Sequence, residues 1–193
     1  MKNPYSIGKD IYLRTPTKED LNGKWHEWFS DPEVTRYLSD RWWPNSIEMQ
    51  ESFFNQINTS KTRLVLSIVD KKTDKHIGVG SLGAINWVHR YADLAIIIGE
   101  KEFRNGMYSV QAYHQFISIA FTKLNLKNLK SYYISENTAA KNIHVNFGFE
   151  SVGSLKNFFF NGDKFIDINI EQLSNDCKLW NNNKLINWLD NRK

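Results

Sequence analysis

The feature that most constrains this chain is a strand, a short charged loop and a long helix in immediate succession. Apolar residues predict a strand over 91–98 that stops at Gly99, and apolar periodicity predicts a helix over about 106–123. Another strand is predicted over 129–134, which makes the unit a β-α-β crossover between two parallel strands. A helix that begins after a strand can place backbone N–H groups in front of a phosphate.

The other expected elements surround this unit. We expect helices after Thr17, from Asp31, from Ser46 through 57, over 138–146 and over most of 171–192. Expected strands cover 11–14, 63–69, 77–84, 149–152 and 165–170, the last two joined by a Gly162-Asp163 turn. Antiparallel hairpins followed by crossovers indicate an α/β protein with a mixed sheet.

Composition narrows the class of protein. A length of 193 residues, without repeats or linkers, suits one domain. The net charge of +4 mildly favours an anionic ligand, but no basic block indicates nucleic acid. We find no signal peptide and no apolar run of membrane-spanning length, and the single cysteine, Cys177, agrees with a reducing compartment. We therefore expect a soluble cytoplasmic protein with no membrane, nucleic-acid or metal partner.

A second informative segment begins at Asn137 and ends at Gly148. If it is helical, Asn137, Ala140, Lys141 and His144 fall at i, i+3, i+4 and i+7 and share one face. Gly148 would end the helix, as a left-handed C-terminal residue often does. A polar stripe with a small residue in its middle leaves room for a ligand along the helix.

This segment resembles the late motif of the GNAT acetyltransferases: Asn, Ala at plus three, an ionisable residue at plus seven, and Gly-Phe at plus eleven. The runs IYLRTPTKEDLNGKWHEWFSDPEVTRYL and HIGVGSLGAINWVHRYADLAIIIGEKEF resemble the RimJ/RimL-like branch of that family. The resemblance covers about 10–170. It implies one GNAT-like domain over 1–193, with parallel strands splayed at the cofactor cleft, helices on both faces of a mostly antiparallel sheet, and an extra helical segment over about 174–193.

The resemblance also implies acetyl-CoA as donor, with CoA as product. The strand before the loop would hold the pantetheine arm, and the loop with its helix N-terminus would hold the pyrophosphate. The implied cofactor-binding residues are Ile97, Ile98, Gly99, Arg104, Asn105, Gly106, Met107, Tyr108, Ser109, Asn137, Ala140 and Lys141. The chain departs from the family's loop pattern, because Met107 and Ser109 stand where glycine or alanine belongs. We expect Gly106 to replace the missing glycine if the turn shifts by one residue.

Catalytic roles are also implied. His144 stands where many relatives have the tyrosine thought to protonate the departing thiolate, and a positioned histidine can serve as that acid. Asp93 occupies the strand beside the expected acetyl site, on the face of Ala95 and Ile97, and is the expected base. The expected acceptor-binding residues are Trp43, Trp87 and His89.

The leading interpretation is an N-acetyltransferase that moves acetyl directly to a primary amine. The amine can belong to a small molecule, a nucleotide-linked amino sugar or a protein N-terminus, and a homodimer is compatible with the sequence. One alternative is a non-catalytic acyl-CoA-binding or interaction module with a degenerate loop. Another is a scaffold that does not bind CoA and associates through its terminal helix.

Overall fold

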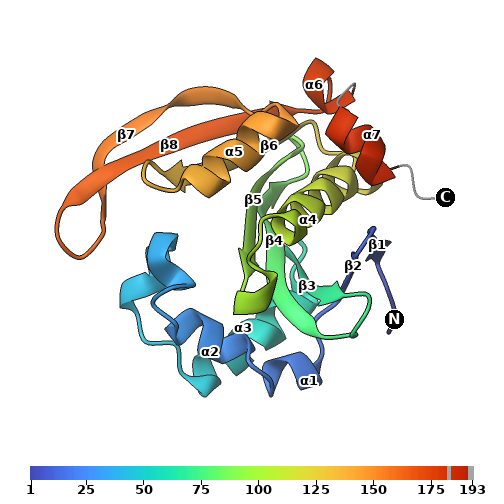
Figure 1. Cartoon of the computed structure of the whole chain (residues 1–193), viewed down its shortest axis with the longest axis vertical. Coiled ribbons are helices and arrows are strands. Elements are labelled where there is room, and N and C mark those ends of the chain that lie inside the picture. The colour runs from blue at the N-terminus through green and yellow to red at the C-terminus, as the bar shows by residue number, and fades with distance from the viewer. Residues whose placement is uncertain (182–183, 191–193) are drawn as a thin grey trace.

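The computed structural model describes residues 1–181 and 184–190. One eight-stranded sheet has the order β1-β2-β3-β4-β5-β6-β8-β7 (Figure 1). Its strands are β1 Ser6–Ile7, β2 Ile11–Arg14, β3 Leu64–Asp70, β4 His76–Asn86, β5 Tyr91–Ile98, β6 Asn128–Ile134, β7 Glu150–Phe160 and β8 Phe165–Ser174. Every strand pair is antiparallel except β5 and β6. This arrangement is the mixed, mostly antiparallel sheet that the sequence predicted.

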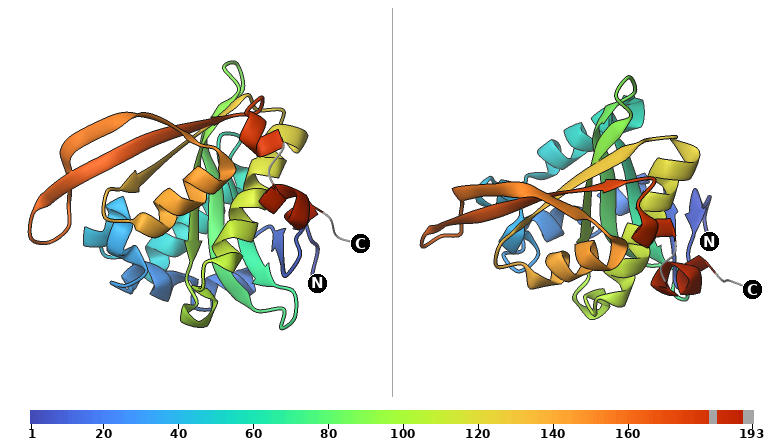
Figure 2. Two further views of the ribbon diagram at one scale, coloured as in Figure 1. Left: turned by 45° about the horizontal axis from the view of Figure 1, so that its top comes forward. Right: turned by 90° about the horizontal axis from the view of Figure 1, so that it is seen from above.

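Helices cover both faces of the sheet (Figures 1 and 2). The N-terminal helices α1, α2 and α3 lie on one face and α4 and α5 on the other. Their bounds are α1 Lys18–Leu21, α2 Trp25–Ser30, α3 Ile47–Thr59, α4 Met107–Ser118 and α5 Thr138–Phe147, followed by α6 Lys178–Asn181 and α7 Lys184–Asp190. Between α2 and α3 run two 3-10 turns, η1 Thr35–Tyr37 and η2 Ser39–Trp42, and a third, η3 Lys101–Phe103, precedes α4; α4 continues into a π turn, Ile119–Lys123.

Of the three apolar clusters among the described residues, two hold these layers together. The larger one packs α4 against the sheet through fully buried Phe116, Ile117 and Leu94. The smaller one packs α2 and α3 against the opposite face around Trp25 and Trp28. Because adjacent residues of β5 face opposite sides of the sheet, the strand contributes to both clusters and lies at the centre of the molecule.

Several expected elements differ in extent or type. Asp31-Pro32 does not start an α-helix: α2 ends at Ser30, and the chain turns before η1. The hairpin strands β7 and β8 are longer than predicted, and the segment 171–174 belongs to β8 because it pairs with β6. The expected C-terminal helical segment over about 174–193 is represented by α6 and α7. Its residues 182–183 and 191–193 lie outside the described part of the chain.

Among the described residues, no helix combines the length and apolar character needed to cross a bilayer.

Candidate active site

The central feature of the site is the point where β5 and β6 part. The two strands pair only at Tyr91–Asn128, Ala92–Leu129 and Asp93–Lys130. Beyond this point β5 continues along β4, while β6 continues along β8 and turns away with the hairpin (Figure 2). We call the unpaired segments, 94–98 of β5 and 131–134 of β6, the branch. Within residues 1–181 and 184–190, no strand pairs with the inner edge of either segment.

Backbone groups of β5 face into the branch. The Ser131 hydroxyl donates to the Leu94 carbonyl oxygen over 3.1 Å, which shows that Leu94 directs its peptide groups toward β6. Peptide direction alternates along a strand, so Ile96 and Ile98 point the same way. The Gly99 N–H instead donates to Ile77 of β4. The groups free to bind a ligand are therefore those of Ile96 and Ile98, and the expected use of Ile97 and Gly99 is corrected by this alternation.

The loop before α4 presents a helix N-terminus. Gly106 precedes the helix with φ of +87°, a conformation that favours glycine, and a Cβ added there would meet no atom within 4 Å. The Met107 side chain is 41% exposed, and its N–H is capped by the Asn105 side chain over 3.2 Å. The N–H groups of Tyr108 and Ser109 belong to the first turn, where an α-helix leaves donors without partners. The loop thus has open space at Gly106 in front of backbone donors, which fits a phosphate.

Arg104 does not present its guanidinium to this loop. Its Nη2 donates to the Gly99 carbonyl oxygen over 2.5 Å, and the side chain also lies 3.4 Å from both Asp31 and Glu33. Arg104 therefore joins the end of β5 to the turn after α2. The expected phosphate-binding role of Arg104 is corrected to a structural one, because carboxylates already neutralise its charge.

Helix α5 shows only part of the expected polar stripe. The Asn137 side chain caps the helix by accepting from the Ala140 N–H over 3.1 Å, so it is committed to the backbone. Ala140 is half-buried and Lys141 is exposed. Within residues 1–181 and 184–190, Lys141 of α5 forms no ion pair, whereas Asn137 positions the helix.

His144 lies in the core. Its side chain is fully buried, stacks on Phe149 at 4.6 Å between ring centroids, and is 2.8 Å from Glu171 through Nδ1. Burial lowers the pKa of His144 below its ordinary value, although Glu171 opposes the shift. A buried, mostly neutral imidazole cannot hand a proton directly to a thiolate in the branch. The expected role of His144 as a direct proton donor is therefore corrected.

A buried polar chain connects His144 to the branch. The Tyr113 hydroxyl of α4 lies 3.4 Å from His144 Nε2, and Tyr113 also interacts with Ser131, whose hydroxyl reaches Leu94. Burial raises the pKa of Tyr113 to about 12, so the phenol is protonated at neutral pH. These hydrogen-bonded side chains run from Glu171 to the Leu94 carbonyl oxygen, at the position where the two strands part.

Asp93 stands at the last paired position of the branch. It is opposite Lys130 in register, and its carboxylate lies 3.1 Å from the Lys130 ammonium. Half-buried Asp93 shares the strand face of exposed Ala95 and half-buried Ile97, as the sequence predicted. A carboxylate beside the free segment of β5 can accept a proton from an amine that enters from this face.

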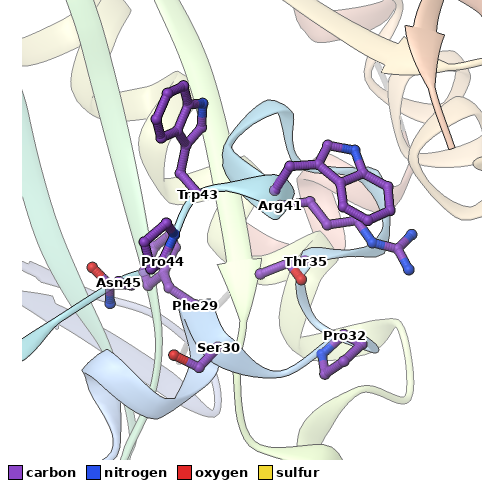
Figure 3. Close-up of a pocket in the computed structure, with 9 residues that line it drawn as sticks. Phe29, Ser30, Pro32, Thr35, Arg41, Trp43, Pro44 and Asn45 are labelled. Atoms are coloured by element: carbon purple, nitrogen blue, oxygen red, sulfur yellow. The ribbon is translucent and has the colours of Figure 1, made fainter. Parts of the chain in front are cut away.

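A cavity of about 430 Å³ opens on that face beside α2 (Figure 3). It is lined by Phe29, Ser30, Pro32, Thr35, Arg41, Trp42, Trp43, Pro44 and Asn45. We call it the tryptophan cavity. Trp43, one of the expected acceptor-binding residues, lines it. Trp87 and His89 do not, because they sit in the turn before β5, at the end of the strand opposite the Gly106 loop. Among the described residues, no three metal-ligating side chains form a cluster.

Sequence reasoning missed four residues of the site. Ser131, Tyr113 and Glu171 form the buried chain, and Ile96 supplies free backbone groups. Strand alternation would have revealed Ile96 once Leu94 was placed toward β6. The other three come from different elements and meet only in the folded chain, so no local pattern identifies them.

Comparison with known proteins now decides the family. The sequence profile described as an acetyltransferase (GNAT) domain matches residues 10–150. The chain belongs to the GNAT acetyltransferase family. This membership confirms the predicted enzyme class, an N-acetyltransferase that uses acetyl-CoA.

Relatives of this chain support the same conclusion. The spermidine N(1)-acetyltransferase of Vibrio cholerae serotype O1 is 25% identical over 162 residues, 84% of this chain and 91% of the relative. A solved structure of the Vibrio cholerae spermidine N-acetyltransferase with CoA and spermine matches with a TM-score of 0.80 and 22% identity, covering 90% of this chain and 99% of that one. A GNAT-family acetyltransferase from Bacillus anthracis matches with a TM-score of 0.73 and 16% identity, covering 88% and 97%. These structures confirm the predicted fold.

Proposed function

We propose that this GNAT enzyme transfers acetyl from acetyl-CoA directly to the primary amine of a small molecule at the branch between β5 and β6. The observation that carries the proposal is the parting of the two strands after Asp93–Lys130. Unpaired peptide groups inside a sheet are costly unless a ligand or water satisfies them. An extended amide-containing arm is the kind of ligand that strand edges bind.

The residues present fit the donor. Backbone groups of Ile96 and Ile98 would hold the pantetheine arm, and the amides of Gly106, Tyr108 and Ser109 would hold the pyrophosphate. Methionine at position 107 does not fill the phosphate site, because Gly106 has open space in front of it and Met107 is 41% exposed. Lys141 of α5 is exposed and would add a cation for the phosphates of the donor. When bound, acetyl-CoA supplies the activated acetyl group as a thioester.

The chain's own residues prepare the acceptor. Asp93 would accept a proton from the incoming ammonium, directly or through water, because the amine must be neutral to attack. Trp43 and its cavity would hold the rest of the acceptor on the same side of β5. The buried chain from Glu171 to Ser131 keeps the Leu94 carbonyl in place and so preserves the geometry of the branch. The relatives' acceptors named above support an amine as the acceptor class.

The test is amine-dependent release of free CoA thiol from acetyl-CoA. Wild-type protein should release thiol with at least one member of a panel of small primary amines. Asp93→Asn should lower kcat by about a hundredfold, as expected for loss of a general base, while the Kd for acetyl-CoA changes little. Lys130→Gln is the matched control, since it removes the ion-pair partner but keeps the carboxylate. An unchanged kcat in Asp93→Asn would remove the base role.

The second candidate is the non-catalytic acyl-CoA-binding module. It rests on Met107 and Ser109, which replace the glycine or alanine of the family's loop, and on buried His144, which cannot protonate the thiolate directly. This candidate predicts that acetyl-CoA binds without thiol release for any amine. The scaffold alternative predicts no binding of CoA at all.

Three finer assignments belong to the same proposal. The N-terminal sequence runs support placement in the RimJ/RimL-like branch of the family. The long edge strand β7 supports a homodimer, because it exposes Val152 at 61% and Phe158 at 62%, and the neighbouring β8 exposes Phe165 at 58%. The single cysteine, half-buried Cys177, supports a cytoplasmic location of the protein. Light scattering of wild type and Phe158→Glu tests the dimer, and only the wild type should show twice the monomer mass.

A further inference from the structure

The tryptophan cavity carries positive charge and aromatic surface but no carboxylate. Arg41 is the charged residue in its lining. The Arg41 guanidinium stacks over Trp42 at 4.9 Å from the ring centroid, and its Nη1 lies 3.4 Å from the Arg36 carbonyl oxygen. Within the described part of the chain, no carboxylate forms an ion pair with Arg41 or Arg36. Arginine without a counter-ion, held flat by a ring, is suited to bind an anion.

The two tryptophans of the cavity differ in how their rings are held. Trp42 is fixed, because its Nε1 donates to the Phe160 carbonyl oxygen over 3.2 Å and its ring packs against Gly162 of the β7–β8 turn. Trp43 is 73% exposed, and Figure 3 shows its indole directed away from the chain that carries it. An exposed indole beside an unpaired arginine offers a stacking surface next to a positive charge.

A second cavity of about 340 Å³ shares Pro32 and Arg41 with the first and is lined also by Glu33, Arg36, Tyr37, Glu136 and Asn161. Both carboxylates of this lining lie within ion-pair distance of cations. Glu33 lies 3.4 Å from Arg104 and 3.8 Å from Lys101, and Glu136 lies 3.9 Å from Lys164. Arg36, stacked on Tyr37 at 5.2 Å, has no such partner among residues 1–181 and 184–190. The joined cavities therefore favour an anion.

The segment that forms these cavities spans both arms of the branch. Phe29 packs in the apolar cluster that includes Ile97 of β5. Tyr37 packs in the cluster that includes Ile134 of β6, and the Ser39 hydroxyl lies 3.3 Å from the Tyr132 hydroxyl. An acceptor held by Arg41 and Trp43 thus lies on the face of β5 where Asp93 could receive its proton.

We propose that the acceptor is an amine on an anionic carrier with a planar ring, namely a nucleoside-diphosphate-linked amino sugar, and that it is not a polyamine. Arg41 and Arg36 bind the diphosphate, Trp43 stacks on the base, and the amino sugar extends toward the branch. This assignment rests on the proposed acetyl transfer. Along the described lining of the two cavities, a polycation would meet two arginines that have no ion-pair partner there, and each carboxylate there already lies near a cation. The attraction of an indole face for an ammonium is too weak to offset the repulsion from the arginines.

The test compares acceptors at saturating acetyl-CoA by thiol release. The probes are a UDP-linked amino sugar, the same amino sugar without the nucleotide, and spermidine. The UDP-linked sugar should have a kcat/KM at least about tenfold above the other two. Arg41→Gln should lower that kcat/KM at least about tenfold and leave the free amino sugar unaffected. Arg63→Gln, which removes an arginine stacked on Phe53 outside the cavities, should stay within about twofold of wild type.

A binding arm separates this inference from the proposed function. UDP is titrated into protein saturated with CoA, so that the donor site is blocked. Binding that weakens in Arg41→Gln and Trp43→Ala supports the inference even if no amine releases thiol, a result that would sink the proposed function alone. Preference for spermidine, or equal binding of UDP by wild type and Arg41→Gln, overturns the inference. Inorganic phosphate that displaces UDP at equal concentration overturns the role of the ring.

Discussion

Replacing His144 by phenylalanine separates a structural role from a catalytic one. The substitution keeps an aromatic ring against Phe149 but removes the 2.8 Å contact with Glu171, a hydrogen bond to a charged group. Such bonds contribute about 1.5–3 kcal/mol, and the abandoned carboxylate, which is 7% exposed, adds a desolvation penalty. We therefore expect the free energy of unfolding to fall by about 3 kcal/mol, or Tm by about 6–12 °C for a chain of this size.

The assay is urea unfolding together with steady-state kinetics at a temperature well below Tm. Glu171→Gln is the control, since its amide oxygen still accepts from His144 Nδ1, and it should cost about 1 kcal/mol. The double variant His144→Phe with Glu171→Leu should be more stable than His144→Phe alone, because no carboxylate is left unpaired. A loss of kcat beyond about a hundredfold, with unfolding free energy unchanged, would refute the buried structural role and restore the direct proton donor.

Three further predictions concern the loop before α4, the contacts of Arg104 and the pH dependence of stability. Gly106→Val should raise the Kd for acetyl-CoA at least about tenfold, since it fills the space before the helix and strains a positive φ, whereas Met107→Ala should change it less than about threefold; calorimetry measures both. Arg104→Gln should lower Tm but leave the Kd for acetyl-CoA unchanged, since Arg104 binds the Gly99 carbonyl, and a large rise in Kd would return it to the phosphate site. Unfolding free energy should fall in two ranges as pH decreases. It should fall first below about 6.5, because the unfolded chain protonates His144 there while burial lowers the pKa of His144 in the folded chain. It should fall again below about 4, because Asp20 of α1 is buried in an ion pair with Arg14 of β2; burial alone would raise the Asp20 pKa, but Arg14 outweighs it and lowers that pKa. A curve that is flat from pH 7 to 5 would contradict the role of His144.

Local sequence signals were sufficient for most of the fold. Thr17 and Ser46 precede helices as predicted, and the Ser46 hydroxyl accepts from the Met49 N–H over 3.2 Å. Gly148 ends α5 in the left-handed conformation, with φ of +81°. These features depend on neighbours a few residues away, which is why they could be read directly. Local patterns predict a helix over 171–174, whereas the segment is a strand, because its pairing with β6 is a long-range contact.

The site was harder to predict for the same reason. Helical spacing predicts that His144 shares a polar face with Asn137 and Lys141, but His144 is buried together with Phe147. A histidine can sit there because Glu171, far along the chain on β8, supplies the partner. The position of Arg104 in the loop predicts that it binds phosphate. Only the folded chain shows that the turn after α2 brings Asp31 and Glu33 to its guanidinium. Pairing with carboxylates from other elements therefore sets the structural roles of both His144 and Arg104.

The central claim is that the branch and the Gly106 loop form a donor site for acetyl-CoA. Its most direct test is calorimetric titration of acetyl-CoA into the purified protein, with CoA titrated in parallel. The account predicts one site per chain with a Kd of about 1–100 µM, within the usual range for enzyme substrates. An absence of binding at millimolar acetyl-CoA would contradict it, because the unpaired edge of β5 would then serve no cofactor.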